Sequence, residues 1–293
     1  MFGLFKSRKP LELDPFASNP FAREGFEALL SKDNAKLVEL YKRQHASDRY
    51  SWILTITSNA PDDFDFPYHA EAPELLTIFG ALMISNASKA RGYGVANTVS
   101  DDAVRDMFSY AQSAYDALEV AATLAPKDSV PIAFNIRAAI LASDNSNHVF
   151  ELVEHLHQTT EPTLFAPVNY LIHQQEKWMG SHEKMWQIAN HYAATGPNPC
   201  WKALIAFAKI EEWLWFAAFE DDRDLKKAYS DRRFSQEFKD EISTLDAEFW
   251  SALKAFDGEI PESEKRFAHD YFGGLSFKLG DKALARPHME AIG

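Results

Sequence analysis

The sequence predicts an all-α fold of stacked antiparallel helix hairpins, an α-solenoid, on three observations. Pro126, Pro162 and Pro197 recur at intervals of 36 and 35 residues, and a period of about 34 residues is typical of stacked helix pairs. Apolar residues fall at helical spacing along most of the chain. The 293 residues include only 12 glycines, too few for the turns that many short β-strands need.

The N-terminal third predicts helices that are less regular than the rest. Apolar residues at helical spacing indicate a hairpin and two further helices, over 21–30, 37–41, 48–58 and 73–89. Glycines end the last of these helices shortly before residue 95. We therefore expect a flexible tail over 1–14 and one helical repeat domain over 15–293, with a subdivision near 92–98 as an alternative.

The helix expected over 100–125 carries a family resemblance. Its small, large, small and terminal proline positions resemble those of the second helix of a tetratricopeptide repeat, at Ala114, Leu118, Ala121 and Pro126. The layout is also similar to an uncharacterised bacterial domain-of-unknown-function family, through the segments 180–186 and 213–216. These resemblances imply a tetratricopeptide-like α-solenoid that binds a partner, and they supply no catalytic residue.

Composition and charge restrict the function further. The net charge of −13 argues against nucleic acid as a partner, because nucleic-acid binders need clustered Lys and Arg. The acidic excess fits a basic protein or peptide partner, but the simpler explanation is the solubility of a cytoplasmic protein. Cys200 is the only cysteine, so no internal disulfide can form, and we expect a buried thiol in a reducing compartment. No apolar run reaches the 18 residues that a membrane-spanning helix needs.

The segment from Trp201 to Phe219 predicts a central buried helix that is apolar on nearly every side. Glu212 falls inside its apolar stripe, where an unpaired carboxylate is costly. One reading is an ion pair with Lys209 or with a cation from a neighbouring helix. The other is a groove, lined also by Glu211 and Trp215, that receives a basic or hydrogen-bonding group.

Metal chemistry has one candidate set, His148, Glu151 and His155, which share one helix face. A solvated polar flank explains the same pattern, since the three lie beside the apolar face rather than in it. After Gly180, Ser181 is expected to cap a helix over 185–194. We predict no cofactor and no catalytic residue.

The predicted function is non-enzymatic: a binding or scaffold protein that holds a protein or peptide partner on a concave surface. Large aromatic rings and the two carboxylates are the expected partner contacts. They are Tyr170, Trp178, Trp186, Glu211, Glu212, Trp213 and Trp215. Two alternatives stay open: a small-ligand protein or enzyme with a carboxylate pocket near Glu211 and Glu212, and a toxin-neutralising or secretion-associated accessory protein.

Overall fold

The computed structural model describes residues 14–16, 19–62, 64–92, 99–142, 147–156, 158–178 and 180–292, and most of these residues lie in helices. These residues form no β-strand, and one isolated bridge joins Asp128 to Glu161. The predicted all-α class is confirmed. The helices are α1 Ala22–Leu30, α2 Asn34–Lys42, α3 Ala46–Ser58, α4 Pro73–Arg91, α5 Asp101–Leu124, α6 Ser129–Leu141, α7 Asn147–Leu156, α8 Phe165–His173, α9 His182–Thr195, the 3₁₀ helix η2 Pro199–Lys202, α10 Ala203–Ala218, α11 Arg223–Arg233, α12 Gln236–Ala255, α13 Glu262–Lys278 and α14 Lys282–Ala291.

Short polar side chains fix the starts of several helices by accepting an otherwise unpaired backbone N–H. Ser100 accepts from Ala103 N at the start of α5, and Ser235 does the same for Phe238 N at α12. Ser181 accepts from Lys184 N at 3.2 Å, so its predicted capping role at α9 is confirmed.

The segment predicted as one helix from Trp201 to Phe219 is divided into η2 and α10. Pro199 opens η2, where a residue without an N–H leaves no donor unsatisfied. The first half of α10, up to Ile210, is buried, whereas the residues from Glu211 onwards are partly or largely exposed. The expected central buried helix is therefore confirmed for its first half only.

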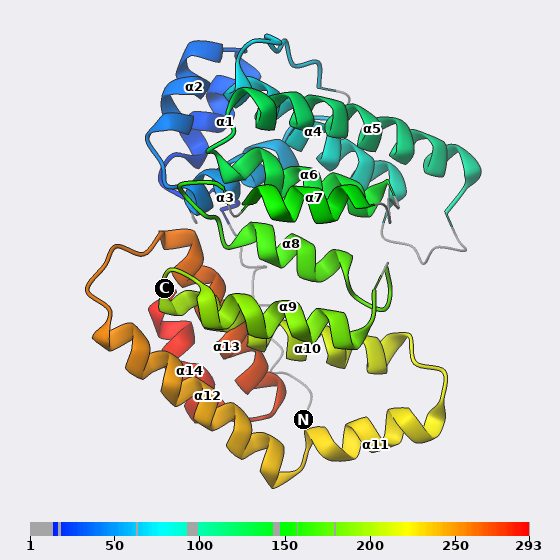
Figure 1. Cartoon of the computed structure of the whole chain (residues 1–293), viewed down its shortest axis with the longest axis vertical. Helices are drawn as coiled ribbons and strands as arrows, with labels where there is room; N and C mark the ends of the chain where they lie inside the picture. Colours follow the sequence, from blue (N-terminus) through cyan, green and yellow to red (C-terminus); the bar gives the residue numbers. More distant parts are fainter. Residues whose placement is uncertain are drawn as a thin grey trace, which may run out of the picture.

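The two largest hydrophobic cores of the described residues both include side chains of α8, which lies between α7 and α9 (Figure 1). The N-terminal core gathers apolar side chains of α1–α6, among them the fully buried Trp52. The C-terminal core gathers those of α8, α9, η2, α10, α12 and α13 around the buried Phe249 and Phe272. Such large buried rings supply much of the hydrophobic stabilisation of a helical fold.

A row of aromatic rings connects the two cores. The ring of Tyr50 on α3 stacks on Phe134 of α6 at 4.2 Å and on Phe165 of α8 at 4.7 Å between centroids. Phe165 in turn meets the edge of Phe267 on α13 at 6.0 Å. Because Phe165 packs against both cores, α8 joins the two halves of the chain, and α3 and α13 also contact each other across them.

Some expectations concern residues outside the described ranges. They include most of the predicted tail, 1–13, and residues 93–98 of the predicted subdivision.

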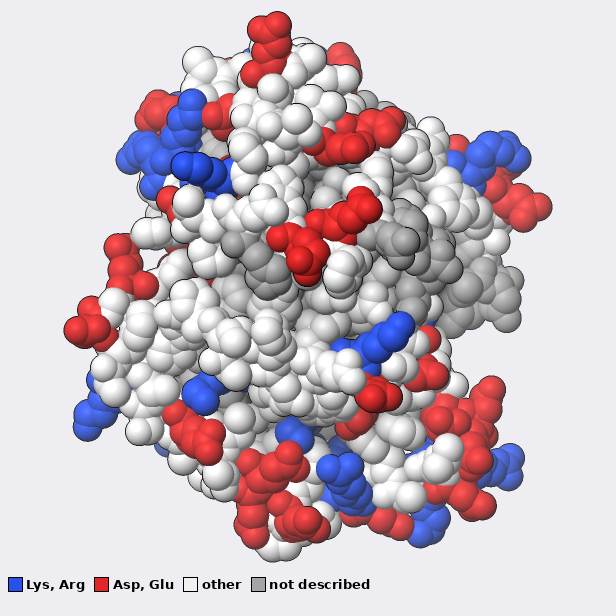
Figure 2. All heavy atoms as spheres, viewed as in Figure 1, with Lys and Arg blue, Asp and Glu red and all other residues white. Residues whose placement is uncertain are grey.

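Within the described ranges, no helix is both long and apolar enough to cross a bilayer. On the face shown in Figure 2, acidic side chains gather over α7, where Glu151 and Glu154 are exposed.

Candidate functional site

The two predicted carboxylates, Glu211 and Glu212, lie on α10 and are both paired within the protein. Glu211 forms an ion pair with Lys177 at 2.8 Å. Glu212 accepts a hydrogen bond from the indole N–H of Trp186 on α9 at 2.9 Å. Each acid is only partly buried, so Glu212 does not lie inside a buried apolar stripe.

The predicted ion pair of Glu212 with Lys209 is also wrong. Lys209 is 5% exposed and pairs with Glu241 of α12 at 2.7 Å. Its ammonium group lies 5.2 Å from the centre of the Trp186 ring, an arrangement that favours a buried cation. The sequence could not reveal this partner, because residue 241 is on a different helix.

The other predicted aromatic contacts spread over several environments. Trp213 lies beside Lys278 of α13 and Arg233 of α11, at 3.9 and 4.9 Å from its ring centre. Trp215 meets the edge of the His182 ring. Trp178 lies in the α8–α9 connection, and Tyr170 of α8 packs between two apolar clusters. The structure therefore brings Trp186 and Glu212 together, while Trp213 contacts cations of other helices.

The candidate metal set on α7 does not form a ligand cluster. His148 Nδ1 lies 3.9 Å from Glu151 Oε2. No group of three or more His, Cys, Asp or Glu residues in the described ranges could hold a metal ion.

The prediction that Cys200 is buried is confirmed. The residue is fully buried, and burial raises the pKa of its thiol to about 12.

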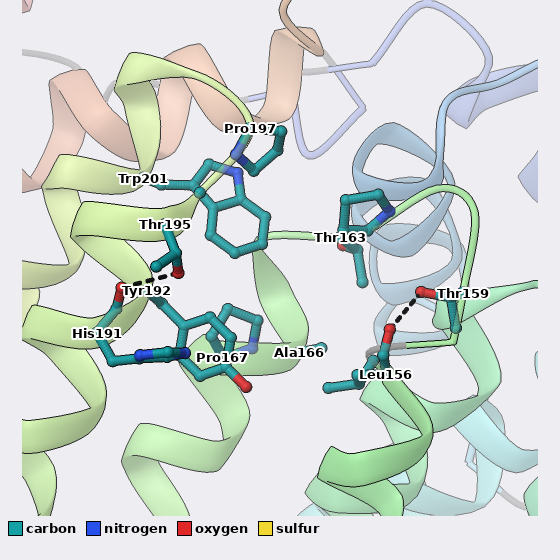
Figure 3. Close-up of a pocket in the computed structure, with 12 residues that line it drawn as sticks. Leu156, Thr159, Thr163, Ala166, Pro167, His191, Tyr192, Thr195, Pro197 and Trp201 are labelled. Carbon is teal, nitrogen blue, oxygen red and sulfur yellow. Dashed lines mark hydrogen bonds between the residues drawn. The ribbon is translucent and has the colours of Figure 1, made fainter.

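A cleft of about 470 Å³ opens between α7, α8, α9 and η2, and sequence reasoning did not identify it (Figure 3). Two of the periodic prolines, Pro162 and Pro197, contribute to its wall. None of its described lining residues is Lys, Arg, Asp or Glu. The lining is formed by Leu156, Thr159, Pro162, Thr163, Ala166, Pro167, His191, Tyr192, Thr195, Gly196, Pro197 and Trp201.

Local sequence explains how the cleft is built. α7 ends at Leu156 and α9 ends at Thr195, and the proline-containing connections that follow turn the chain back. Gly196 lies directly against Trp201, since a Cβ placed there would be 2.5 Å from the Trp201 Cβ. A glycine is therefore needed for the indole to pack at the end of α9.

The hydroxyl of Tyr192 has no hydrogen-bond partner among the described residues, and its ring lines the cleft (Figure 3). Burial, with Tyr170 and the carboxylate of Glu154, raises the pKa of Tyr192 to about 12. The neighbouring threonines are occupied, because Thr159 and Thr195 donate to backbone carbonyls at 2.8 Å. Among its described lining residues the cleft thus presents a mainly apolar surface, on which the Tyr192 hydroxyl has no partner from the described part of the chain.

A buried carboxylate, Glu264 of α13, fixes the inner wall of the cleft. It accepts from Asn198 Nδ2 at 2.7 Å and from the indole N–H of Trp201 at 3.0 Å, both at Oε2. Ser47 donates to Oε1. Burial raises the pKa of Glu264, while these donors favour its charged form. The hydrogen bond from the indole N–H to Glu264 therefore fixes the orientation of the Trp201 ring.

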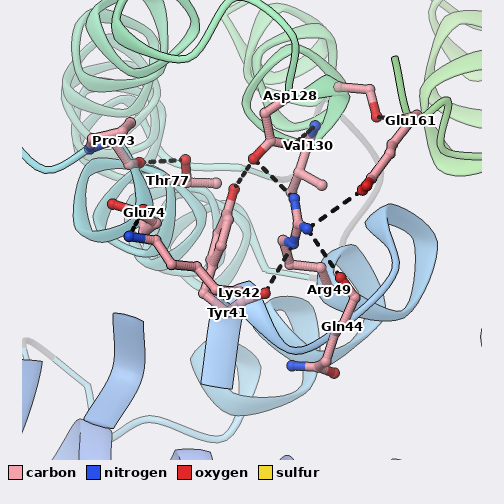
Figure 4. Close-up of polar contacts among 11 residues, drawn as sticks. Tyr41, Lys42, Gln44, Arg49, Pro73, Glu74, Thr77, Asp128, Val130 and Glu161 are labelled. Carbon is pink, nitrogen blue, oxygen red and sulfur yellow. Dashed lines mark hydrogen bonds and ion pairs between the residues drawn. The ribbon is translucent and has the colours of Figure 1, made fainter. Parts of the chain in front are cut away.

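A second polar centre lies at the neighbouring hairpin end (Figure 4). The guanidinium of Arg49 on α3 donates to Asp128 at 3.0 Å and to the carbonyls of Tyr41 and Gln44. The Tyr41 hydroxyl also donates to Asp128, at 2.8 Å. This centre ties α2 and α3 to the α5–α6 connection.

The two centres share a periodic feature. Asp128, Thr163 and Asn198 are spaced 35 residues apart, and each accepts the backbone N–H two residues later, at 3.0, 3.3 and 3.0 Å. This capping series follows the prolines by one or two positions. It is the signal that could have located the hairpin ends more exactly from the sequence.

Comparison of the chain with protein-family models, with curated proteins and with solved structures found no match.

Proposed function

We propose that the protein is a non-enzymatic binding module that holds a segment of a protein or peptide partner in the cleft between α7, α8, α9 and η2. The observation that supports this proposal is the size and the lining of the cleft. Its volume of about 470 Å³ falls within the range of ligand-binding clefts, about 300–1,000 Å³. The half-buried Tyr192 gives it one of the large rigid rings that dominate binding energy at protein interfaces, and Trp201, which is 3% exposed, forms the inner wall.

The way the walls are held supports this role. Trp201 is fixed through Glu264, and Tyr192 packs against the C-terminal core. A cleft whose walls are ordered before binding loses little conformational entropy when a ligand enters. The cleft is thus suited to hold a partner rather than to fold around one.

We propose in addition that α4–α9 form a tetratricopeptide-like solenoid. The 35-residue spacing of Asp128, Thr163 and Asn198 supports this arrangement, as does the pairing of α4 with α5 and of α8 with α9. In a solenoid the end of one hairpin lies against the end of the next, which is where the cleft lies.

The residues predicted from the sequence around Glu211 and Glu212 are proposed as a second, weaker contact surface. Both carboxylates already have partners, Lys177 and Trp186. A ligand that bound them would have to displace these contacts, which reduces the net gain. The cleft has no such competition at the hydroxyl of Tyr192.

The test uses a photo-reactive amino acid placed at Thr195, an exposed lining residue, in the full-length protein inside its native cells. We expect one discrete crosslinked partner, whose crosslinked segment is identified by mass spectrometry. A synthetic peptide of that segment should then bind the purified protein. The matched control is the same amino acid at Ser113, exposed on α5 away from the cleft. Equal products from both positions, or none from Thr195, would refute the proposal.

A further inference from the structure

A smaller pocket lies between α10 and α11, and α11 is at the edge of the molecule (Figure 1). The volume of this pocket is about 140 Å³, and Trp213 and Phe216 of α10 form its apolar wall. The facing wall comes from α11 and includes Lys226, Ser230 and Arg233. No Asp or Glu is among its described lining residues. The pocket therefore combines two cations and a hydroxyl with aromatic rings.

The face that α11 turns toward α10 carries a ring and polar side chains. The ring of Tyr229 stacks on Phe216 at 4.2 Å between centroids. Lys226, Ser230 and Arg233 recur at i, i+4 and i+7, so they share that face of the helix. An amphipathic helix normally turns apolar residues toward its neighbour and charges toward solvent. Because α11 buries no residue at all, packing does not explain the cations on its inner face.

The cations of the pocket have no carboxylate partner in the described part of the chain, whereas acids of α11 are used elsewhere. Asp231 pairs with Lys227 at 2.6 Å, and the side chain of Asp222 caps the start of α11. Lys226 lies near the N-terminal end of α11, where the helix dipole disfavours a positive charge. Arg233, the last residue of the helix, is likewise in no ion pair with a described carboxylate.

Arg233 is the least compensated of these groups. Its guanidinium carbon lies 4.9 Å from the ring centre of Trp213 and 4.4 Å from that of Phe234. Rings cover the faces of a guanidinium but leave its N–H edge free, and Arg233 Nε is buried without a hydrogen-bond partner among the described residues. Burial lowers the pKa of Arg233. Lys278 of α13 adds a further positive charge, 3.9 Å from the Trp213 ring centre.

One acid approaches the pocket without lining it. Burial and then Glu212 raise the pKa of Tyr229, so this carboxylate lies near the Tyr229 side chain. Glu212 accepts the indole N–H of Trp186 on α9 and forms no ion pair with the pocket cations. A single carboxylate does not neutralise three cations, so the pocket attracts an anion.

We infer that this pocket binds the phosphoryl group of a small-molecule phosphate monoester. Lys226 and Arg233 donate to phosphoryl oxygens in charge-assisted hydrogen bonds, and the Ser230 hydroxyl donates to another. Two cations match the charge of a phosphate monoester, about −1.5 to −2 at pH 7, whereas a carboxylate would leave one of them uncompensated. The pocket is smaller than the sites that enclose a whole drug-sized ligand. It therefore holds the phosphoryl group, while the carrier packs on the partly exposed ring of Trp213.

Calorimetric titration of the full-length protein with phenyl phosphate tests this inference. At about pH 8 the ester is a dianion, because its second pKa is about 6. Phenyl sulfate, which has a similar shape and one negative charge, is the matched control, and benzoate tests for a carboxylate site. We expect phenyl phosphate to bind at least about tenfold more tightly than either. All titrations use the same ionic strength, since salt screens exposed charges.

Variants of α11 separate the pocket from the general charge of the helix. Arg233→Met should weaken phenyl phosphate binding on the order of tenfold, and Lys226→Met should weaken it several-fold. The matched control is Lys227→Met, whose cation pairs with Asp231 outside the pocket, and its affinity should change by less than about twofold. Circular dichroism and thermal unfolding show that each variant is folded, as expected for a helix without buried residues.

Three outcomes would overturn the inference. They are an absence of binding, equal affinity for phenyl sulfate or benzoate, and an equal loss in Lys227→Met and Arg233→Met. The last would show that the charge of the whole helix attracts the ester. The pocket shares no described lining residue with the cleft. The Thr195 crosslink and these titrations therefore succeed or fail independently of each other.

Discussion

Acid should loosen the C-terminal helix α14, because it is held by a buried chain of ionisable groups. His288 of α14 is fully buried, and its Nε2 lies 2.5 Å from Asp246 of α12. Its Nδ1 lies 2.9 Å from Nδ1 of His269 on α13. One of these two nitrogens must donate and the other accept, so both histidines cannot be protonated without placing two N–H groups against each other.

The magnitude follows from the pKa of His269. Burial, followed by the nearby His288, lowers this pKa from 6.5 to about 4, although Glu262 and Asp246 act in the opposite direction. Between these values the unfolded chain binds more protons than the folded one, so stability falls as the pH falls. One pKa unit corresponds to about 1.4 kcal/mol, which sets an upper limit of about 3 kcal/mol. From about pH 7 to about pH 5 the loss is about 2 kcal/mol.

The assay is urea denaturation of the wild type and of His269→Asn at several pH values, followed by Trp fluorescence and circular dichroism. Asparagine can still donate an amide N–H to His288 but does not titrate. We expect the wild type to lose about 2 kcal/mol more than this variant over that interval. His69→Asn, at an exposed histidine, is the control and should follow the wild type. Equal pH slopes in all three proteins would refute the reasoning.

Three further predictions concern buried groups. Glu264→Gln places an amide donor opposite other donors and should lower the free energy of unfolding by about 2–4 kcal/mol in a urea titration, whereas Glu262→Gln, exposed on the same helix, should change it by less than about 0.5 kcal/mol. Arg49→Met leaves Asp128 without its guanidinium and should cost about 3 kcal/mol in the same titration; a cost below about 1 kcal/mol would contradict the role of this ion pair. The buried Cys200 thiol should react with a disulfide reagent at about pH 8 only as fast as the protein unfolds, and rapid stoichiometric labelling of the folded protein would contradict its burial.

Local signals in the sequence predicted much of the helical framework. Ser100 and Ser181 mark helix starts because a capping hydroxyl acts within three residues. The same local reasoning placed the α4 start at Pro73 and the burial of Cys200 correctly. Such features depend on neighbours in sequence, so one chain without any alignment is enough to find them.

The candidate site could not be predicted in the same way, because its contacts join residues far apart in the sequence. Glu264 looks like an ordinary acid in the first turn of a helix, yet its partners Ser47 and Asn198 are 217 and 66 residues away. For Glu212 the sequence led to the opposite mistake. Helical periodicity placed its side chain in the core, but the residues of α10 after Ile210 are partly or largely exposed. Helical periodicity identifies a face, whereas its burial depends on how far the neighbouring helices extend.

The capping series links the fold to the proposed site. Each of Asp128, Thr163 and Asn198 accepts the backbone N–H two residues later, near the start of a helix, and also contacts a distant element. Asp128 accepts from Arg49 of α3, the Thr163 hydroxyl forms a hydrogen bond with the Ser47 hydroxyl of α3, and Asn198 donates to Glu264 of α13. A ligand in the cleft therefore contacts the α7–α8 and α9–η2 connections, which carry Thr163 and Asn198. Because a ligand that binds only the folded state stabilises it, occupation of the cleft should raise the stability of both halves together.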